Sequence, residues 1–355
     1  MARLRDLGFT IGTFPTGALN AITDVADVSV GHRTVIRDTP RVARTGVTIV
    51  NSRAAGRRDQ LCYGAMHSFN GNGEMTGSHW LDESGLLSGP IGITNTHQVG
   101  VVRDTLVAAE LERDPDAAWC LPVVGETYDG FLNDIDAFHL TADDVRAAVA
   151  DADRAGAEAQ PVAEGNVGGG TGMVCHEFKG GIGTSSRLVE IGGDTFTVGA
   201  LVQANYGARS LLHLAGIPVG TIIDERVVAP PSDPAVADAG SIIVVVATDA
   251  PLLADQCKRV ARRATVGLSR VGGTGGNGSG DIFIAFSTHN EVPLHATSPI
   301  AVTTMPAAGM TPLFNATAEA VEESIWNALC AAESMTGYRG RTVEAIPLDL
   351  LQRLR

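Results

Sequence analysis

The segment GGTGGNGSGDIFIAFSTHN, residues 272–290, constrains this chain more than any other. Ser279 lies between two glycines, after a run with almost no side chains and before residues 281–287, whose apolar character predicts a buried strand. Glycine adopts positive φ without a steric penalty and lets other groups approach the backbone closely. Because a turn needs fewer glycines, we expect a close approach or an unusual backbone conformation beside Ser279.

Two known glycine motifs do not account for this segment. Residues 273–278 match G-x-G-x-x-G, but that motif binds a phosphate only after a strand and at the start of a helix. Here the order of the predicted elements is reversed, which argues against a dinucleotide site. A nucleophile elbow, G-x-S-x-G, needs a glycine at the position that Asn277 occupies.

A serine in such a backbone can attack the peptide bond that precedes it. The hydroxyl of Ser279 would add to the carbonyl of Gly278 and move the acyl group from nitrogen to oxygen, and backbone strain would favour the step. Hydrolysis of the ester would expose Ser279 as a new N-terminus, whose α-amine has a reference pKa of about 8 and can assist the hydroxyl. A plain glycine-rich turn is the alternative interpretation.

Five segments carry a resemblance that favours the first interpretation. In order along about the last two thirds of the chain they are GETYDGFLNDI, LVQANYG, VATDAPL, GNGSGDIFIAFST and NATAEAVEESIWNAL. Together they resemble the self-processing N-terminal-nucleophile aminopeptidase family, which includes L-aminopeptidase/D-esterases and β-peptidyl aminopeptidases. The resemblance implies an α/β fold, a four-layer α/β/β/α sandwich, and a cut between Gly278 and Ser279.

The same resemblance implies an organisation and an activity. Residues 1–355 would form a single catalytic domain that cuts itself into a large subunit, 1–278, and a small subunit, 279–355. The activity would be that of a serine aminopeptidase, a hydrolase that releases N-terminal residues from small peptides, amides or esters through an acyl-enzyme on Ser279. We expect a homo-oligomer, because members of the family commonly form tetramers of the processed pair.

Two residues near the C-terminus resemble the assisting groups of the family. Thr317 and Glu319, in Thr-Ala-Glu, take the positions of a serine and a glutamate that orient and assist the nucleophile. Threonine departs from the family serine, since it keeps the hydroxyl but adds a methyl group that restricts χ1. The alternative is structural, with Thr317 as the N-cap of a helix and Glu319 in its first turn.

Three residues upstream complete the implied site. Asn205 resembles the oxyanion-hole asparagine, whose amide would donate to the negative charge of the tetrahedral intermediate. Glu126 and Tyr128 resemble the pair that binds the free α-amine of the substrate and contacts the reacting group, and a carboxylate suits a cationic amine. Without the resemblance, Asn205 would be a turn residue at a strand end, Glu126 a loop carboxylate and Tyr128 a partly buried tyrosine.

Hydrophobic periodicity predicts alternating elements that fit layered α/β packing. The predicted strands besides 281–287 are 22–35, 45–50, 195–204 and 241–247. The predicted helices are 101–112, 142–155 with Thr141 as N-cap, 251–270 and 318–334. A stretch rich in Pro, Ala and Asp, 227–240, predicts a surface loop.

Composition limits the partners and the compartment. A net charge of -14 argues against nucleic acid, whose binding needs clustered Lys and Arg. The longest apolar runs fall short of the roughly 20 residues of a membrane helix, and the first residues lack an apolar secretion signal, so we expect a cytoplasmic protein without a membrane partner. Five scattered cysteines favour free thiols, and nine histidines without ligand spacing predict no metal. No motif requires a cofactor.

Two alternatives of different classes remain open at this stage. The first is an acyltransferase similar to ornithine acetyltransferases, which resemble this family in fold and also cleave themselves but use a threonine nucleophile. The second is a ligand-binding protein of the same fold that never cleaves itself, in which Ser279→Ala would change nothing.

Overall fold

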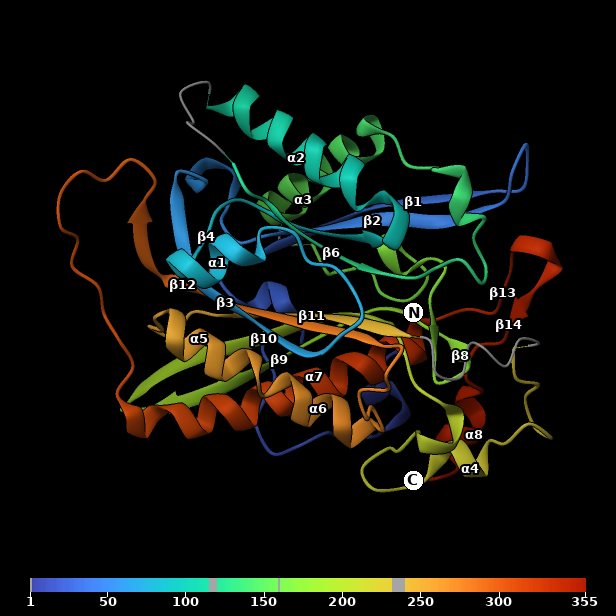
Figure 1. The fold of residues 1–355 in the computed structure, drawn as a ribbon. Coiled ribbons are helices and arrows are strands. Elements are labelled where there is room, and N and C mark those ends of the chain that lie inside the picture. Colours follow the sequence, from blue (N-terminus) through green and yellow to red (C-terminus); the bar gives the residue numbers. More distant parts are fainter. Residues whose placement is uncertain (1, 115–119, 159, 232–239) are drawn as a thin grey trace.

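The computed structural model describes residues 2–114, 120–158, 160–231 and 240–355. Two β-sheets face each other, and helices cover the outer face of each sheet (Figure 1). The larger sheet has the order β4 (Leu86–Leu87), β3 (Gln60–Gly71), β12 (Gly280–Pro293), β11 (Ser241–Thr248), β10 (Asp194–Asn205), β9 (Gly181–Ile191). The smaller sheet has the order β1 (Ser29–Arg37), β2 (Ala43–Asn51), β5 (Ile91–Asn95), β6 (Val123–Thr127).

The helices form the two outer layers of this α/β/β/α sandwich. Those over the smaller sheet are α2 (Val99–Arg113) and α3 (Ala142–Glu158), and those over the larger sheet are α5 (Ala254–Ala261), α6 (Ala264–Val271) and α7 (Met310–Ala331). Shorter elements are α1 (Ser78–Ser84), α4 (Val219–Ile222), α8 (Leu348–Gln352) and the strand pairs β7 (Val174–Cys175) with β8 (Phe178–Lys179) and β13 (Met335–Thr336) with β14 (Thr342–Val343). No helix within the described ranges is long and apolar enough to cross a membrane.

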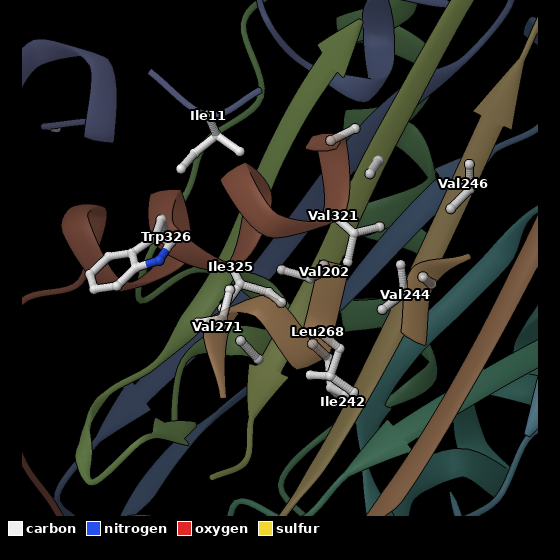
Figure 2. Close-up of a cluster of buried hydrophobic side chains, with 14 of the residues drawn as sticks. Ile11, Val202, Ile242, Val244, Val246, Leu268, Val271, Val321, Ile325 and Trp326 are labelled. Atoms are coloured by element: carbon white, nitrogen blue, oxygen red, sulfur yellow. The ribbon is translucent and has the colours of Figure 1, made fainter. Parts of the chain in front are cut away.

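Side-chain alternation along β11 explains why this sheet is covered on both faces. Because successive residues of a strand point to opposite faces, Ile242 and Val244 pack under the helices, while Ile243 and Val245 pack against the other sheet. Figure 2 shows the helix side of this core, where side chains from α6 and α7 meet β10 and β11. All four β11 side chains are fully buried, as the uninterrupted apolar run predicts.

Strand β12 occupies the interior of the larger sheet. It pairs in parallel with β11 and antiparallel with β3, and its first residue, Gly280, lies opposite Ser241 and Gly71. Ser241 in turn lies opposite Asn205, the last residue of β10. This register brings the start of β12, the start of β11 and the ends of β3 and β10 to one end of the sheet.

Most predicted elements are confirmed, with shifts at their ends. The strands predicted at 45–50, 195–204, 241–247 and 281–287 are β2, β10, β11 and β12, and the helices predicted at 101–112 and 142–155 are α2 and α3. Thr141 caps α3, since its hydroxyl accepts from the backbone N–H of Asp144 at 3.4 Å. The last predicted helix, 318–334, starts earlier than expected, because α7 begins at Met310.

Two predictions of secondary structure are wrong in part. The strand predicted at 22–35 begins only at Ser29, because the Asp24 carboxylate accepts from the N–H groups of Leu19 and Ala21 at 2.9 and 3.0 Å and holds a turn before it. The helix predicted at 251–270 is two helices, since the Arg263 N–H binds the carbonyl three residues back and tightens the chain there. Of the loop predicted at 227–240, residues 232–239 lie outside the described residues.

The cysteines agree with the prediction of free thiols. All five are free in the structure, and all but Cys120 are buried.

Candidate active site

Ser279 lies immediately before β12, at the end of a turn, and its side chain is buried. Its N–H donates to the carbonyl of Gly276 at 2.9 Å, and only 6% of its surface is exposed. Its hydroxyl donates to Oδ1 of Asp281 at 2.6 Å. A nucleophilic hydroxyl with a carboxylate at this distance has the geometry of a nucleophile paired with its base.

Asp281 is a buried carboxylate without a cationic partner among the described residues. Burial raises the pKa of Asp281 to about 6, while the hydrogen bond from Ser279 and the backbone N–H of Ile242 act in the opposite direction. Tyr206 lies nearby, and burial together with the charges of Cys175 and Asp281 raises the pKa of its phenol well above the usual value. A carboxylate with a pKa of about 6 is ionised at neutral pH and basic enough to accept a proton from the hydroxyl.

The glycines before Ser279 let the loop pack tightly against its surroundings. Gly272 and Gly275 have positive φ, 113° and 68°. A Cβ atom on Gly272 would lie 1.8 Å from the carbonyl oxygen of Leu211, and one on Gly275 would lie 2.7 Å from the ring of Phe69. Neither Gly278 nor Ser279 has positive φ, so the expected backbone strain is not located at the Gly278–Ser279 bond.

Asn205 reaches the same end of the sheet from β10. It lies opposite Ser241, which lies opposite Gly280, so two strand spacings, about 10 Å, separate the backbones of Asn205 and β12. Its amide group donates to the carbonyl of Tyr128 at 3.0 Å and its amide oxygen accepts from Val174 N–H at 2.8 Å. Asn205 therefore ties three segments together at the site.

Glu126 approaches Ser279 from the smaller sheet. Its carboxylate accepts from the N–H of Glu74 at 3.0 Å and from the hydroxyl of Thr96. A Cβ atom on Gly73 would lie 3.1 Å both from Oε1 of Glu126 and from Cα of Gly280, so the carboxylate and the start of β12 both lie against Gly73. Burial raises the pKa of Glu126, and no Arg or Lys of the described ranges forms an ion pair with it.

Tyr128 places its ring at the surface beside these groups. The side chain is 49% exposed and its ring lies over Gly130, while its carbonyl is the one that Asn205 binds. The structure thus brings Ser279, Asn205, Glu126 and the backbone of Tyr128 to one region.

Thr317 and Glu319 are not part of this group. Both lie inside α7, where the Thr317 hydroxyl donates to the carbonyl of Leu313 at 2.7 Å and Glu319 accepts from Arg187 at 3.2 Å. Arg187 lies opposite Val198, six residues along β10 from Ala204, so Glu319 lies about 20 Å from the Ser279 end of the sheet. The N-cap alternative is wrong, since α7 starts seven residues before Thr317.

Sequence reasoning missed three polar residues that contact the nucleophile segment. One is Asp281, whose signal was its spacing, because residues two apart in an extended chain point to the same face. The others are Asn70 and Asn72, whose amide groups donate to the carbonyls of Ser279 and Gly278. No local pattern could reveal these two, because the pairing of β3 with β12 brings them from about 200 residues away.

The structure shows no candidate metal site in the parts of the chain it describes. No group of three or more His, Cys, Asp or Glu residues there is placed to hold an ion.

The fold and the paired serine and carboxylate define a class, the serine hydrolases of the N-terminal-nucleophile (Ntn) type. A family model described as peptidase family S58 matches residues 20–343, and the chain belongs to this family. It is therefore a serine aminopeptidase, a hydrolase with the Ntn-hydrolase fold.

Individual relatives agree with this assignment. The beta-peptidyl aminopeptidase BapA of Sphingosinicella microcystinivorans is 46% identical over 97% of this chain and 89% of its own length. The solved structure of a Burkholderia sp. beta-aminopeptidase has a TM-score of 0.91 at 49% identity and covers 100% of this chain and 98% of its own. That of an L-aminopeptidase D-Ala-esterase/amidase from Ochrobactrum anthropi has a TM-score of 0.90 at 44% identity, covering 99% and 97%.

Proposed function

We propose that the chain cuts itself between Gly278 and Ser279 and then uses Ser279 as the nucleophile of an aminopeptidase. The contact of 2.6 Å between the Ser279 hydroxyl and Asp281 at the start of β12 carries this proposal. Asp281 takes the hydroxyl proton, in place of Thr317 and Glu319, which lie inside α7 with other partners. The acyl group leaves Ser279 when water hydrolyses the ester.

Substrate can reach Ser279 only after the segment that ends at Gly278 has moved away. In the intact chain Ser279 is 6% exposed, and Gly278 occupies the position of the acyl group that a substrate would present. Once the bond is cut, the free end at Gly278 can leave, and the carbonyl of the first substrate residue takes its place. The α-amine of Ser279 is then available to share the proton with Asp281.

Three residues would contact the substrate around the reacting carbonyl. Glu126 would pair with the free α-amine, because it is a buried carboxylate without a cationic partner close to Gly280. Asn205 would donate to the oxyanion after its amide turns from the carbonyl of Tyr128, whose exposed ring would contact the substrate near the reacting group.

The substrate class follows from this arrangement and from the relatives. We propose small peptides, amides or esters with a free N-terminal amine, and β-amino-acid residues among them. Proteins named beta-peptidyl aminopeptidase and beta-aminopeptidase are 46% and 49% identical to this chain, and an L-aminopeptidase D-Ala-esterase/amidase is 44% identical.

A chromogenic assay tests the proposed activity. Purified protein is given p-nitroanilides of a β-amino acid and of an L-amino acid, each with a free or an N-acetylated amine. We expect release from the free-amine substrates, none from the acetylated ones, and a raised KM for Glu126→Gln with a smaller change in kcat. Equal hydrolysis of free and acetylated substrates would contradict a role for Glu126 in binding the amine. Transfer of the acyl group to an added amine in preference to water would favour the acyltransferase alternative.

Assembly and compartment complete the proposal. We propose a homo-oligomer, a tetramer of processed pairs, in the cytoplasm, where buried free thiols remain reduced. Light scattering during size-exclusion chromatography measures the mass directly, and a mass of one processed pair would contradict the tetramer.

A further inference from the structure

Asn72 lies at the carbonyl group of the bond that is to be cut. It follows the last residue of β3, Gly71, which pairs with Gly280, so the register of β3 and β12 brings Asn72 beside Gly278. The side-chain amide of Asn72 donates to the carbonyl oxygen of Gly278 at 2.8 Å. The backbone N–H of Asn72 donates to the carbonyl of Ser279 at 3.3 Å.

Other groups already hold the turn in place. The amide of Asn70 donates to the carbonyl of Gly276 at 2.9 Å and to the carbonyl of Ser279. The N–H of Ser279 closes the turn on Gly276 at 2.9 Å. The Asn72 side chain is exposed, and a single exposed hydrogen bond adds little to stability. Its contact with Gly278 therefore matters more for the chemistry of that carbonyl than for the fold.

We propose that Asn72 is the oxyanion donor of the self-cleavage step, an inference that rests on the proposed cut at Gly278–Ser279. Oγ of Ser279 forms a bond to the carbonyl carbon of Gly278, and the hydroxyl proton passes to Asp281. The negative charge appears on the carbonyl oxygen that Asn72 already binds. The C–N bond then breaks, the nitrogen takes the proton back from Asp281, and Gly278 is left as an ester on Ser279 until water hydrolyses it.

This role separates Asn72 from Asn205. The amide of Asn205 donates to the carbonyl of Tyr128 in the intact chain, two strands away from β12. The intact chain thus has one side-chain donor in hydrogen-bonding contact with the scissile carbonyl among the described residues, and that donor is Asn72. Asn205 serves the later reaction with substrate, and Asn72 serves the reaction of the chain with itself.

A time course of cleavage tests the inference. Wild type, Asn72→Ala, Asn72→Asp and the matched control Asn70→Ala are made by cell-free synthesis, and the intact and cut chains are followed by mass spectrometry. Removing an oxyanion donor slows a reaction about 100- to 1,000-fold, so we expect that loss for Asn72→Ala. Asn72→Asp should be at least as slow, because its carboxylate repels the oxyanion. Asn70→Ala, which leaves the Gly278 carbonyl bound, should be much less affected.

Hydroxylamine identifies the step at which Asn72 acts. It attacks an accumulated ester and releases a large fragment that ends in a Gly278 hydroxamate. Because Asn72 acts before the ester forms, hydroxylamine should not restore the cleavage rate of Asn72→Ala, and rescue to the wild-type rate would overturn the proposal. Equal slowing by Asn70→Ala and Asn72→Ala would overturn it as well, since both would then act by ordering the turn.

The outcomes also separate this inference from the proposed function. A wild-type chain that stays intact would overturn the cut at Gly278–Ser279 and the role of Asn72 with it. A wild-type chain that splits there, together with an Asn72→Ala chain that splits equally fast, would overturn the role of Asn72 alone. Thermal unfolding of each variant on a Ser279→Ala background shows whether a slow variant is folded.

Discussion

Ser279 with Asp281 and Thr317 with Glu319 are both pairs of a hydroxyl and a carboxylate two residues apart, but the surroundings of the two pairs differ. Asp281 lies on β12 and Ser279 immediately precedes that strand, where residues two apart can share a face, and their side chains are 2.6 Å apart. Thr317 and Glu319 lie in a helix, where residues two apart do not face each other, and each has its own partner elsewhere. The same spacing therefore brings the hydroxyl and the carboxylate into contact at the start of β12 and not within α7.

The charges around the two carboxylates differ as well. Burial without a cation raises the pKa of Asp281 to about 6. On α7, Arg187 binds both Glu319 and Glu323, and although burial would raise the pKa of Glu323, Arg5 and Arg187 lower it. Arg5 and Arg187 precede the proposed cut and α7 follows it, so these ion pairs would keep the two fragments together. One end of the larger sheet is thus suited to proton transfer, and the α7 region is suited to holding the molecule together.

The largest expected effect is that of Asp281→Asn. Loss of a general base costs about 100- to 10,000-fold in rate, and we expect self-cleavage to slow by that amount. Intact mass measured over time gives the rate. Cleavage of Asp281→Asn at the wild-type rate would show that Asp281 is not the base of the reaction.

Arg187→Met tests whether the buried ion pairs of α7 hold the molecule together. Breaking a fully buried ion pair costs about 3–5 kcal/mol, because Glu319 loses its cationic partner and Glu323 keeps only Arg5. Urea unfolding on the Ser279→Ala background measures the loss in free energy of unfolding. The control is Arg226→Met, which removes a surface ion pair with Asp224 and should change nothing measurable. If both variants behave alike, α7 does not hold the molecule together in this way.

The pH dependence of self-cleavage should follow Asp281. The carboxylate accepts a proton only when ionised, so the rate should fall about tenfold per pH unit below about pH 6 and level off above it. The free energy of unfolding should depend on pH in the opposite direction. Because the pKa of Asp281 is raised in the folded state, folding favours its protonated form, and the stability that this carboxyl contributes at low pH is lost as the pH rises through about 6. Cleavage rates between about pH 4.5 and 8 give the profile, and a flat profile would exclude Asp281 as the base.

The smallest effects are expected for Thr317→Val and Glu319→Gln. Neither side chain contacts the nucleophile segment, so both variants should cleave themselves at the wild-type rate even where their melting temperatures fall. The mass time course and a melting curve are measured on the same samples. A strong loss of cleavage with unchanged melting would restore Thr317 and Glu319 to the site.

The sequence predicted the layered fold and the close packing around Ser279 well, because the signals for both are local. The apolar runs of β11 and β12 required buried strands, and the glycines around Ser279 required a closely packed loop, as the neighbours of Gly272 and Gly275 confirm. The resemblance supplied the expected cut at Ser279 and the expected roles of Asn205 and Glu126, and the structure brings these three residues to one end of the sheets.

The assisting groups could not be predicted in the same way. The choice between Asp281 and Glu319 depends on whether each carboxylate is on a strand or inside a helix and on which arginine lies beside it. Asn72 depends on the register of two strands far apart in the sequence, which no local pattern determines.

The most direct test of the account is the intact mass of purified wild type beside Ser279→Ala. If Ser279 cleaves the chain, wild type should give fragments of 278 and 77 residues, about 29 and 8 kDa, with the new N-terminus Ser-Gly-Asp-Ile-Phe. Ser279→Ala should remain a single chain of 36.8 kDa. If both proteins stay at full length, fresh and aged, the self-cleavage mechanism is contradicted.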